Sequence, residues 1–340
     1  MQQRIISTKR EREWQGIPGI EYARNGRLWC VFFTGGLKEP EPANYVVLIT
    51  SGNGGATWTD PKVMAAPPGR TRAYDPALWY GPDGRLWLFY NEANLEKKDF
   101  SVWAMMTENP EDPVPLWSKP RRVDLGVPFA FRLNKPTALA SGEWLLPITW
   151  SRTAPERWFA GPQQLQGVAM SADLGATWTL HGAVEAPEWA LENMILERAD
   201  GTVWMLIRTG SGVLWESVSK DRGWSWSQGA PTSIVNPGAR FFLRRLASGR
   251  LLLINTPDPK QRKGLYAYLS DRDDGTGFSA GFELDDRDKV SYPDAIQAQD
   301  GLIYAVHDCD RRGTGEIRLS VFSEDEILAE PSVARHGPPI

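Results

Sequence analysis

The sequence predicts an all-β protein, a six-bladed β-propeller built from four-stranded antiparallel blades. Three observations lead to this fold class: a repeated turn-and-strand unit, a composition rich in aromatic and turn-forming residues, and a lack of helical periodicity. The 340 residues include 16 Trp, 32 Gly and 26 Pro, and this composition favours short strands joined by tight turns. No segment sustains the i, i+3, i+4 apolar spacing of a long helix.

The repeated unit is a turn ending in Gly that lies between two apolar, strand-like runs. Asn, Asp or Ser precedes the glycine each time, a pairing typical of hairpin turns that need a positive φ. A third apolar run and a further turn follow, so each unit reads as four strands. The units recur every 48 to 59 residues, which is the period of propeller blades. The turn glycines are Gly26, Gly84, Gly142, Gly201, Gly249 and Gly301.

A second motif, Ser-x-Asp/Asn-x-Gly-x-Ser/Thr-Trp, follows the third strand of several units. It occurs at 51–60, 171–180 and 219–228, with a degenerate copy at 270–279, and the second unit keeps only Trp117. We expect the Asp and Gly to fold a hairpin and the Trp to pack between blades. The motif therefore has a structural rather than a catalytic role.

The two ends of the chain are expected to meet. The sixth unit has only three clear strands, and residues 4–8 (RIIST) are expected to add the fourth. This pairing would close the ring and remove the open sheet edges that invite aggregation. No linker interrupts the repeats, so residues 1–340 are predicted to form a single domain.

Charge and composition exclude several classes of function. The formal net charge of −4 gives no bulk attraction to nucleic acid or acidic membranes. No apolar run approaches the ~18 residues that span a bilayer. Without a visible signal peptide the chain as written is expected in the cytoplasm, or in the periplasm or outside the cell if a signal was removed. Three histidines and two cysteines lack metal-ligand spacing, so no metal or cofactor is expected. The oligomeric state is not indicated.

The propeller geometry predicts where a site would lie. The first strand of each blade begins, and the second strand ends, on one face of the ring, so residues far apart in the chain converge there. Core packing alone would not favour the charged and polar residues found at these positions, although a wet rim would also be polar. The positions are Gly16, Tyr74, Asp75, Asn134, Lys135, Glu192, Asn193, Arg240, Tyr292 and Asp294 for first strands, and Asn91, Glu92, Arg152, Arg208, Asn255, His307 and Asp308 for second strands.

Three short motifs carry a more specific resemblance. ENMILERADGTVWMLIR contains Glu192 and Arg208, RKGLYAYLSDRDDG contains Arg262, and VSYPD contains Tyr292 at the start of the last unit. With these motifs and its Ser-x-Asp repeats, the chain resembles the sialidase-like, Asp-box (BNR-repeat) propeller superfamily over essentially all six units. Asp boxes alone indicate only the fold, because lectins, sorting receptors and lyases carry them too.

The resemblance implies an exo-acting retaining glycoside hydrolase whose glycan substrate ends in a carboxylate-bearing sugar, sialic acid or a related one. Tyr292 would be the nucleophile and Glu192 would take its proton, a scheme that differs from the usual carboxylate pair. Arg208 and Arg262 would bind the sugar carboxylate through bidentate hydrogen bonds. The structural alternatives are ion pairs between blades for the arginines, packing for Tyr292 and pairing with an arginine for Glu192.

The chain departs from the sialidase pattern at the first blade. Sialidases open that blade with Arg-Ile-Pro, and Gly16 stands here in place of the arginine of their carboxylate-binding triad. Arg72, Arg240 and Lys135 are candidates to replace it from other blades. Further candidate substrate-binding residues at the converging positions are Asn134 and Asp294.

The general acid is the second departure, because the first-blade loop lacks the aspartate of sialidases. Glu39 and Glu41 lie in that loop and Asp75 opens the next unit, and any of them would serve with a raised pKa. The alternatives are solvated loop carboxylates or, for Asp75, a partner of Arg72 or of a backbone amide.

Two other functions stay open at this point. His307, next to Asp308, keeps the possibility of a uronate-directed glycosidase or a polysaccharide lyase, against the alternative of a plain strand-end histidine. A glycan-binding propeller without catalysis would explain both departures from the sialidase pattern.

Overall fold

The computed structural model describes residues 1–154 and 164–329. Within these ranges the chain is all-β, with a single short helix, α1 (Glu324–Ala329), after the last strand. The all-β class and the lack of a long helix agree with the sequence prediction.

The first, fourth and fifth repeats each form a separate four-stranded antiparallel sheet whose strands follow chain order. Apolar runs joined by the predicted Gly turns produce this meander, because each turn reverses the chain so that consecutive strands pair. The strands are β2 (Gln15–Tyr22), β3 (Leu28–Thr34), β4 (Tyr45–Ser51) and β5 (Lys62–Ala65); β15 (Ala190–Glu197), β16 (Val203–Thr209), β17 (Val213–Ser219) and β18 (Ala230–Val235); and β19 (Phe242–Arg245), β20 (Leu251–Asn255), β21 (Lys263–Ser270) and β22 (Phe282–Asp288).

The sixth repeat joins the two ends of the chain in one sheet. Its order is β1-β25-β24-β23, and β1 pairs antiparallel with β25, with Arg4 opposite Leu319. The expected pairing of the N-terminal segment with the last repeat is therefore confirmed, with the strand beginning at Gln2. The strands are β1 (Gln2–Ser7), β23 (Val290–Gln297), β24 (Ile303–Cys309) and β25 (Glu316–Phe322).

The second and third repeats share one nine-stranded sheet instead of forming two separate ones. The join is β10, which pairs antiparallel with β12 and, at Phe129 opposite Phe100, parallel with β8. The first strand expected from KPTALA shrinks to the two residues of β11, because Pro136 before it has no N–H for the ladder. The strands are β6 (Arg72–Tyr80), β7 (Leu86–Asn94), β8 (Asp99–Thr107), β9 (Arg121–Val123), β10 (Phe129–Phe131), β11 (Thr137–Ala138), β12 (Trp144–Ser151), β13 (Leu165–Ser171) and β14 (Thr179–Val184).

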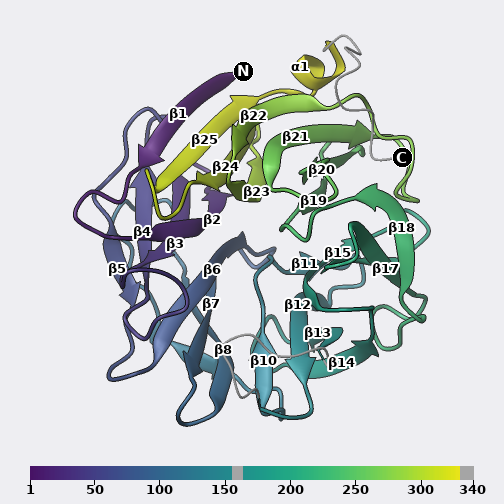
Figure 1. Cartoon of the computed structure of the whole chain (residues 1–340), viewed down its shortest axis with the longest axis horizontal. Helices are drawn as coiled ribbons and strands as arrows, with labels where there is room; N and C mark the ends of the chain where they lie inside the picture. The colour runs from purple at the N-terminus through teal and green to yellow at the C-terminus, as the bar shows by residue number, and fades with distance from the viewer. Residues whose placement is uncertain (155–163, 330–340) are drawn as a thin grey trace.

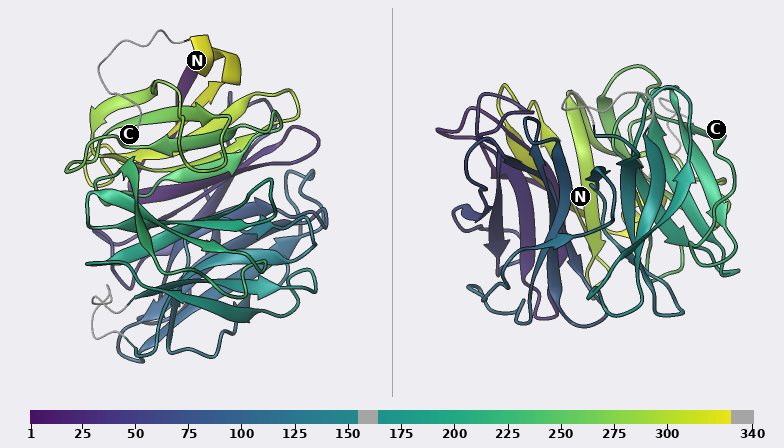
Figure 2. Two further views of the ribbon diagram at one scale, coloured as in Figure 1. Left: turned by 90° about the vertical axis from the view of Figure 1, so that its right-hand side faces the viewer. Right: turned by 90° about the horizontal axis from the view of Figure 1, so that it is seen from below.

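The sheets lie around a common centre. Figure 1 shows β2, β6, β15, β19 and β23 on the inside and the last strand of each repeat on the outside, and Figure 2 shows the sheets side on. Among the inner strands, β2 contacts β6 and β23, and β19 contacts β15 and β23. The third repeat joins this series through the contact of its strand β12 with β15, and it joins the second repeat through the shared sheet. Apolar side chains also fill the space between the second and third repeats of the shared sheet; Trp144, for example, packs edge-on against Trp79 and Trp87.

The Ser-x-Asp motif forms the structural turn expected of it. In the copy at 171–180, Ser171 Oγ accepts a hydrogen bond from Gly175 N and Asp173 accepts one from Thr177 N, both at 2.8 Å. The Trp178 ring then meets Phe89 of the neighbouring repeat edge-on. The same bonds recur at 219–228. In the copy at 171–180, the motif therefore joins a hairpin to a contact between repeats.

Candidate active site

Four inner strands carry the same backbone irregularity, a β-bulge two or three residues after the strand begins to pair. The register of β2, β6, β15 and β23 shifts at this point, and the bulged residue has a positive φ in each strand. Such residues are uncommon outside Gly, and a bulge re-aims a side chain while storing strain that functional sites use. The four residues are Ile17 (58°), Asp75 (47°), Glu192 (56°) and Tyr292 (54°).

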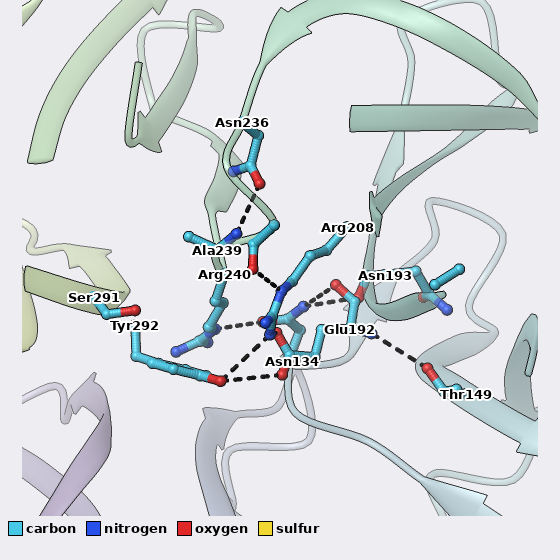
Figure 3. Close-up of polar contacts among 12 residues, drawn as sticks. Asn134, Thr149, Glu192, Asn193, Arg208, Asn236, Ala239, Arg240, Ser291 and Tyr292 are labelled. Atoms are coloured by element: carbon cyan, nitrogen blue, oxygen red, sulfur yellow. Dashed lines mark hydrogen bonds and ion pairs between the residues drawn. The ribbon is translucent and has the colours of Figure 1, made fainter. Parts of the chain in front are cut away.

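Glu192, Arg208 and Tyr292 meet in one buried cluster (Figure 3). Arg208, on β16, forms an ion pair with Glu192 Oε2 and lies 3.3 Å from the Tyr292 hydroxyl through Nη1. The Tyr292 hydroxyl also lies 3.5 Å from Glu192 Oε1. These residues are separated by up to 100 positions in sequence, and their predicted convergence is observed.

Three guanidinium groups surround the Tyr292 ring. The guanidinium carbons of Arg311, Arg262 and Arg208 lie 5.0, 5.6 and 5.9 Å from its centroid. Burial raises the pKa of Tyr292 and the charge of Glu192 raises it further, while the three arginines act in the opposite direction. The phenol is therefore neutral at pH 7 and has a carboxylate beside it to receive its proton.

A cavity of about 590 Å³ opens beside the tyrosine and is lined by Trp14, Glu39, Arg262, Ser291 and Arg311, among others. Arg262 is held by hydrogen bonds from Nη2 to the Gly238 carbonyl (3.1 Å) and from Nη1 to Ser291 Oγ (3.4 Å). Arg311 was not among the residues expected from sequence. It comes from the turn between β24 and β25, whose path only the tertiary structure reveals.

The three candidate acids lie in different surroundings. Glu39 reaches the cavity and forms an ion pair with Arg311. Glu41 accepts a hydrogen bond from Leu37 N at 2.8 Å and so braces its own loop. Asp75 is buried, and within the described residues its Oδ1 has no hydrogen-bond partner.

Asp75 has the protonation behaviour that a general acid requires. Its pKa is raised to about 8, first by burial and then by the charge of Glu39, with Glu192 adding to the effect and Arg72 opposing it. Arg72 itself lies over the ring of Tyr74, with its guanidinium carbon 3.7 Å from the centroid. Arg72 is thus a neighbour of the acid candidate on the same strand, β6.

Four other predicted residues form a buried polar network among the inner strands. Lys135 lies 2.8 Å from Glu21 and 3.1 Å from Asp294, and Arg240 lies 3.5 Å from Asp294. Asn134 accepts a 2.8 Å hydrogen bond from Arg240 and donates to the carbonyl of Glu192 at 3.0 Å. Figure 3 shows the part of this network that reaches the bulge, from Arg240 through Asn134 to Glu192.

His307 lies on β24, and its side chain contacts β22. Its Nε2 is 3.0 Å from Asp285 Oδ2, and Asp285 in turn binds Arg287 at 2.8 Å. No contact in residues 1–154 and 164–329 links His307 to Glu192 or Tyr292. Among the same residues there is no group of three side chains able to hold a metal ion, and no helix long and apolar enough to cross a membrane.

Comparison with known proteins identifies the family. The family model described as BNR repeat-like domain matches residues 26–305. The chain belongs to the BNR-repeat family. The resemblance noted from the Asp boxes is thereby confirmed, and no curated protein matches the sequence.

Solved structures show the same fold at low identity. A Dyadobacter fermentans protein of unknown function is 18% identical, with a TM-score of 0.76 over 94% of this chain and 97% of that one. A Hadza microbial sialidase is 16% identical, with a TM-score of 0.76 over 92% of this chain and 66% of that one. The intramolecular trans-sialidase from Ruminococcus gnavus, in complex with oseltamivir carboxylate, is 16% identical, with a TM-score of 0.72 over 96% and 98%.

Proposed function

We propose that this protein is an exo-acting retaining glycoside hydrolase that removes a carboxylate-bearing terminal sugar. The observation that carries the proposal is the Tyr292 hydroxyl, which lies against both Glu192 and Arg208 beside a cavity lined by arginines. Sialidase structures among the fold neighbours support the reaction class.

In the proposed first step, the Tyr292 oxygen attacks the anomeric carbon as its proton passes to Glu192. A phenol with a raised pKa is a poor nucleophile by itself, so a general base acting during the attack is needed. Being neutral, the phenol avoids the repulsion that an anionic nucleophile would meet from a sugar carboxylate. Arg208 orients the pair, because its Nη1 contacts both side chains.

Asp75 is the acid that this scheme requires. With its pKa near 8 it carries a proton at pH 7 and transfers it to the leaving oxygen as the glycosidic bond breaks. The sugar is then bound to Tyr292. In the second step Asp75, now ionised, takes a proton from water, the water oxygen attacks the anomeric carbon, and the tyrosine leaves with the proton returned by Glu192.

The ring that assembles these residues is proposed to have six blades. The nine-stranded sheet then counts as two blades linked through β10, and the pairing of β1 with β25 completes the sixth. The contacts of β2 with β6 and β23, of β15 with β12 and β19, and of β19 with β23 support this arrangement.

Turnover of a fluorogenic sialoside tests the proposal. Tyr292→Phe removes only the hydroxyl and should reduce kcat by roughly a thousandfold or more, the scale seen when a nucleophile is lost. Tyr304→Phe is the matched control, because Tyr304 stacks on Tyr22 in another part of the molecule. Equal rates for the wild type and Tyr292→Phe would reject the assignment of the nucleophile.

The arginines that line the cavity could bind the carboxylate of any acidic sugar, so uronides are tested in parallel. Release of an unsaturated uronate would identify a lyase, and tight binding of a sugar acid without turnover would identify a glycan-binding protein. A lyase would need a base, and the residues of the Tyr292 cluster are already assigned to hydrolysis while His307 is paired with Asp285.

A further inference from the structure

Arg311 reaches the cavity from the last repeat of the chain and packs against the first. It lies two residues after the end of β24 and crosses to β2, at the opposite end of the chain. Its Nη1 forms an ion pair with Glu39, its Nε lies 3.8 Å from Asp308 Oδ2, and its guanidinium carbon lies 6.0 Å from the Trp14 centroid. Two residues of the first repeat, Glu39 and Trp14, and the neighbouring Asp308 therefore hold this guanidinium near the ring of Tyr292.

Gly16 leaves the space that Arg311 occupies. A Cβ built on Gly16 would lie 2.7 Å from Arg311 Cγ, closer still to Cδ, and 2.9 Å from Asp308 Oδ2. Real Cβ atoms essentially never approach other heavy atoms this closely, so any side chain at this position would push Arg311 away. The φ of Gly16 is not in the left-handed region, so the need for glycine arises from this close approach and not from the backbone conformation.

Arg311 also retains capacity for a ligand. Its Nη2 has no hydrogen-bond partner in the part of the chain that the structure describes, and the residue lines the same cavity as Arg262. A guanidinium held in a fixed orientation presents paired N–H groups that match the two oxygens of a carboxylate.

We propose that Arg311 is an anion-binding residue of this cavity, acting with Arg208 and Arg262, and that Gly16 is the residue that admits it. The arginine missing from the first inner strand is supplied from the far end of the chain. This inference rests on the proposed function for the class of ligand, a sugar carboxylate. It goes further by naming the residue that discriminates carboxylate from neutral sugar.

The test compares an acid with its uncharged ester. Affinities are measured by calorimetry for N-acetylneuraminic acid and D-glucuronic acid and for the methyl ester of each. The wild type should prefer at least one acid over its ester, and Arg311→Ala should reduce that preference by about tenfold or more while leaving ester binding unchanged. Arg222→Ala, which removes an exposed arginine paired with Glu143, should leave the preference intact.

Gly16→Ala gives a second, independent test that leaves Arg311 in the chain. It should lower the acid preference as Arg311→Ala does, and it should have no further effect in the Arg311→Ala background, because the two changes act on the same side chain. If Arg311→Ala fails to fold, as judged by thermal unfolding, the Gly16→Ala result decides alone.

Two results would overturn the inference: a wild type without any preference for the acids, or a preference that survives both substitutions. Failure of the proposed function gives a different pattern. Acid preference that depends on Arg311 without any Tyr292-dependent turnover would leave the inference standing and remove the catalytic proposal. Turnover that depends on Tyr292 but not on Arg311 would support the catalytic proposal and overturn the inference about Arg311.

Discussion

Asp75→Asn should make the stability of this protein less dependent on pH. The folded state raises the pKa of Asp75 from its ordinary 3.8 to about 8. Between these values the folded carboxyl keeps its proton and the unfolded one loses it. The destabilisation caused by Asp75 is therefore smallest below pH 4. The free energy of unfolding falls as the pH rises towards 8.

The size of the effect follows from this difference. The carboxyl is only 7% exposed, so solvent screening does little to reduce the shift. Raising the pH from 4 to 7 should cost the wild type about 4 kcal/mol of stability through this one group. Asn cannot ionise, so the difference in unfolding free energy between Asp75→Asn and the wild type should grow by about that amount over the same range.

Urea unfolding measured at intervals from pH 4 to pH 8 checks this expectation. The introduced amide also changes the hydrogen bonding and so shifts the unfolding free energy by an amount that does not vary with pH. This shift cancels, because the test is how the difference in unfolding free energy between variant and wild type changes with pH. Asp60→Asn, at an exposed aspartate paired with Arg10, should give a curve parallel to the wild type. A curve for Asp75→Asn that also runs parallel to the wild type would refute the assigned pKa.

Three further changes test other parts of the structure. Gly175→Ala should destabilise the protein by about 1–3 kcal/mol more than Gly201→Ala. Both glycines have φ near 80°, but only a Cβ on Gly175 would meet Trp144 and Trp87, at 3.0 and 3.1 Å. Equal melting temperatures for the two variants would contradict this. Lys135→Met should cost about 3 kcal/mol or more in urea unfolding, because it leaves two buried carboxylates without this cation; near-wild-type stability would show that the network is dispensable. Removing residues 1–8 should expose the edge of β25 and lower the melting temperature with increased aggregation, and an unchanged melting curve would argue against a stabilising role for β1.

The repeat was readable from sequence because its signals are local. Each Asn/Asp/Ser-Gly turn and each Asp box determines the backbone of its own hairpin, so strand order within a repeat followed directly. The merging of the second and third repeats was not readable. It depends on Asn91, which pairs with the backbone of Arg132 through both side-chain atoms, 41 residues away.

The candidate site, too, could be predicted only in part from the sequence. Local sequence patterns identified Glu192, Arg208, Arg262 and Tyr292, and the structure brings the first three together around the side chain of Tyr292. Lys135 and Arg240 stay predicted substrate-binding residues; that they pair with Glu21 and Asp294 could not be read from the sequence, because only the folded chain reveals this proximity. Arg311 was missed because its evidence is an absence, the side chain that Gly16 lacks.

A covalent trap would examine the catalytic role of Tyr292 most directly. A sialosyl fluoride bearing a second fluorine at C3 should react at the anomeric carbon with loss of fluoride and release the sugar slowly. Peptide mass spectrometry should then find the sugar on Tyr292, with no adduct in Tyr292→Phe. An adduct on Asp75 or Glu39, or none on the wild-type protein, would contradict the proposed mechanism.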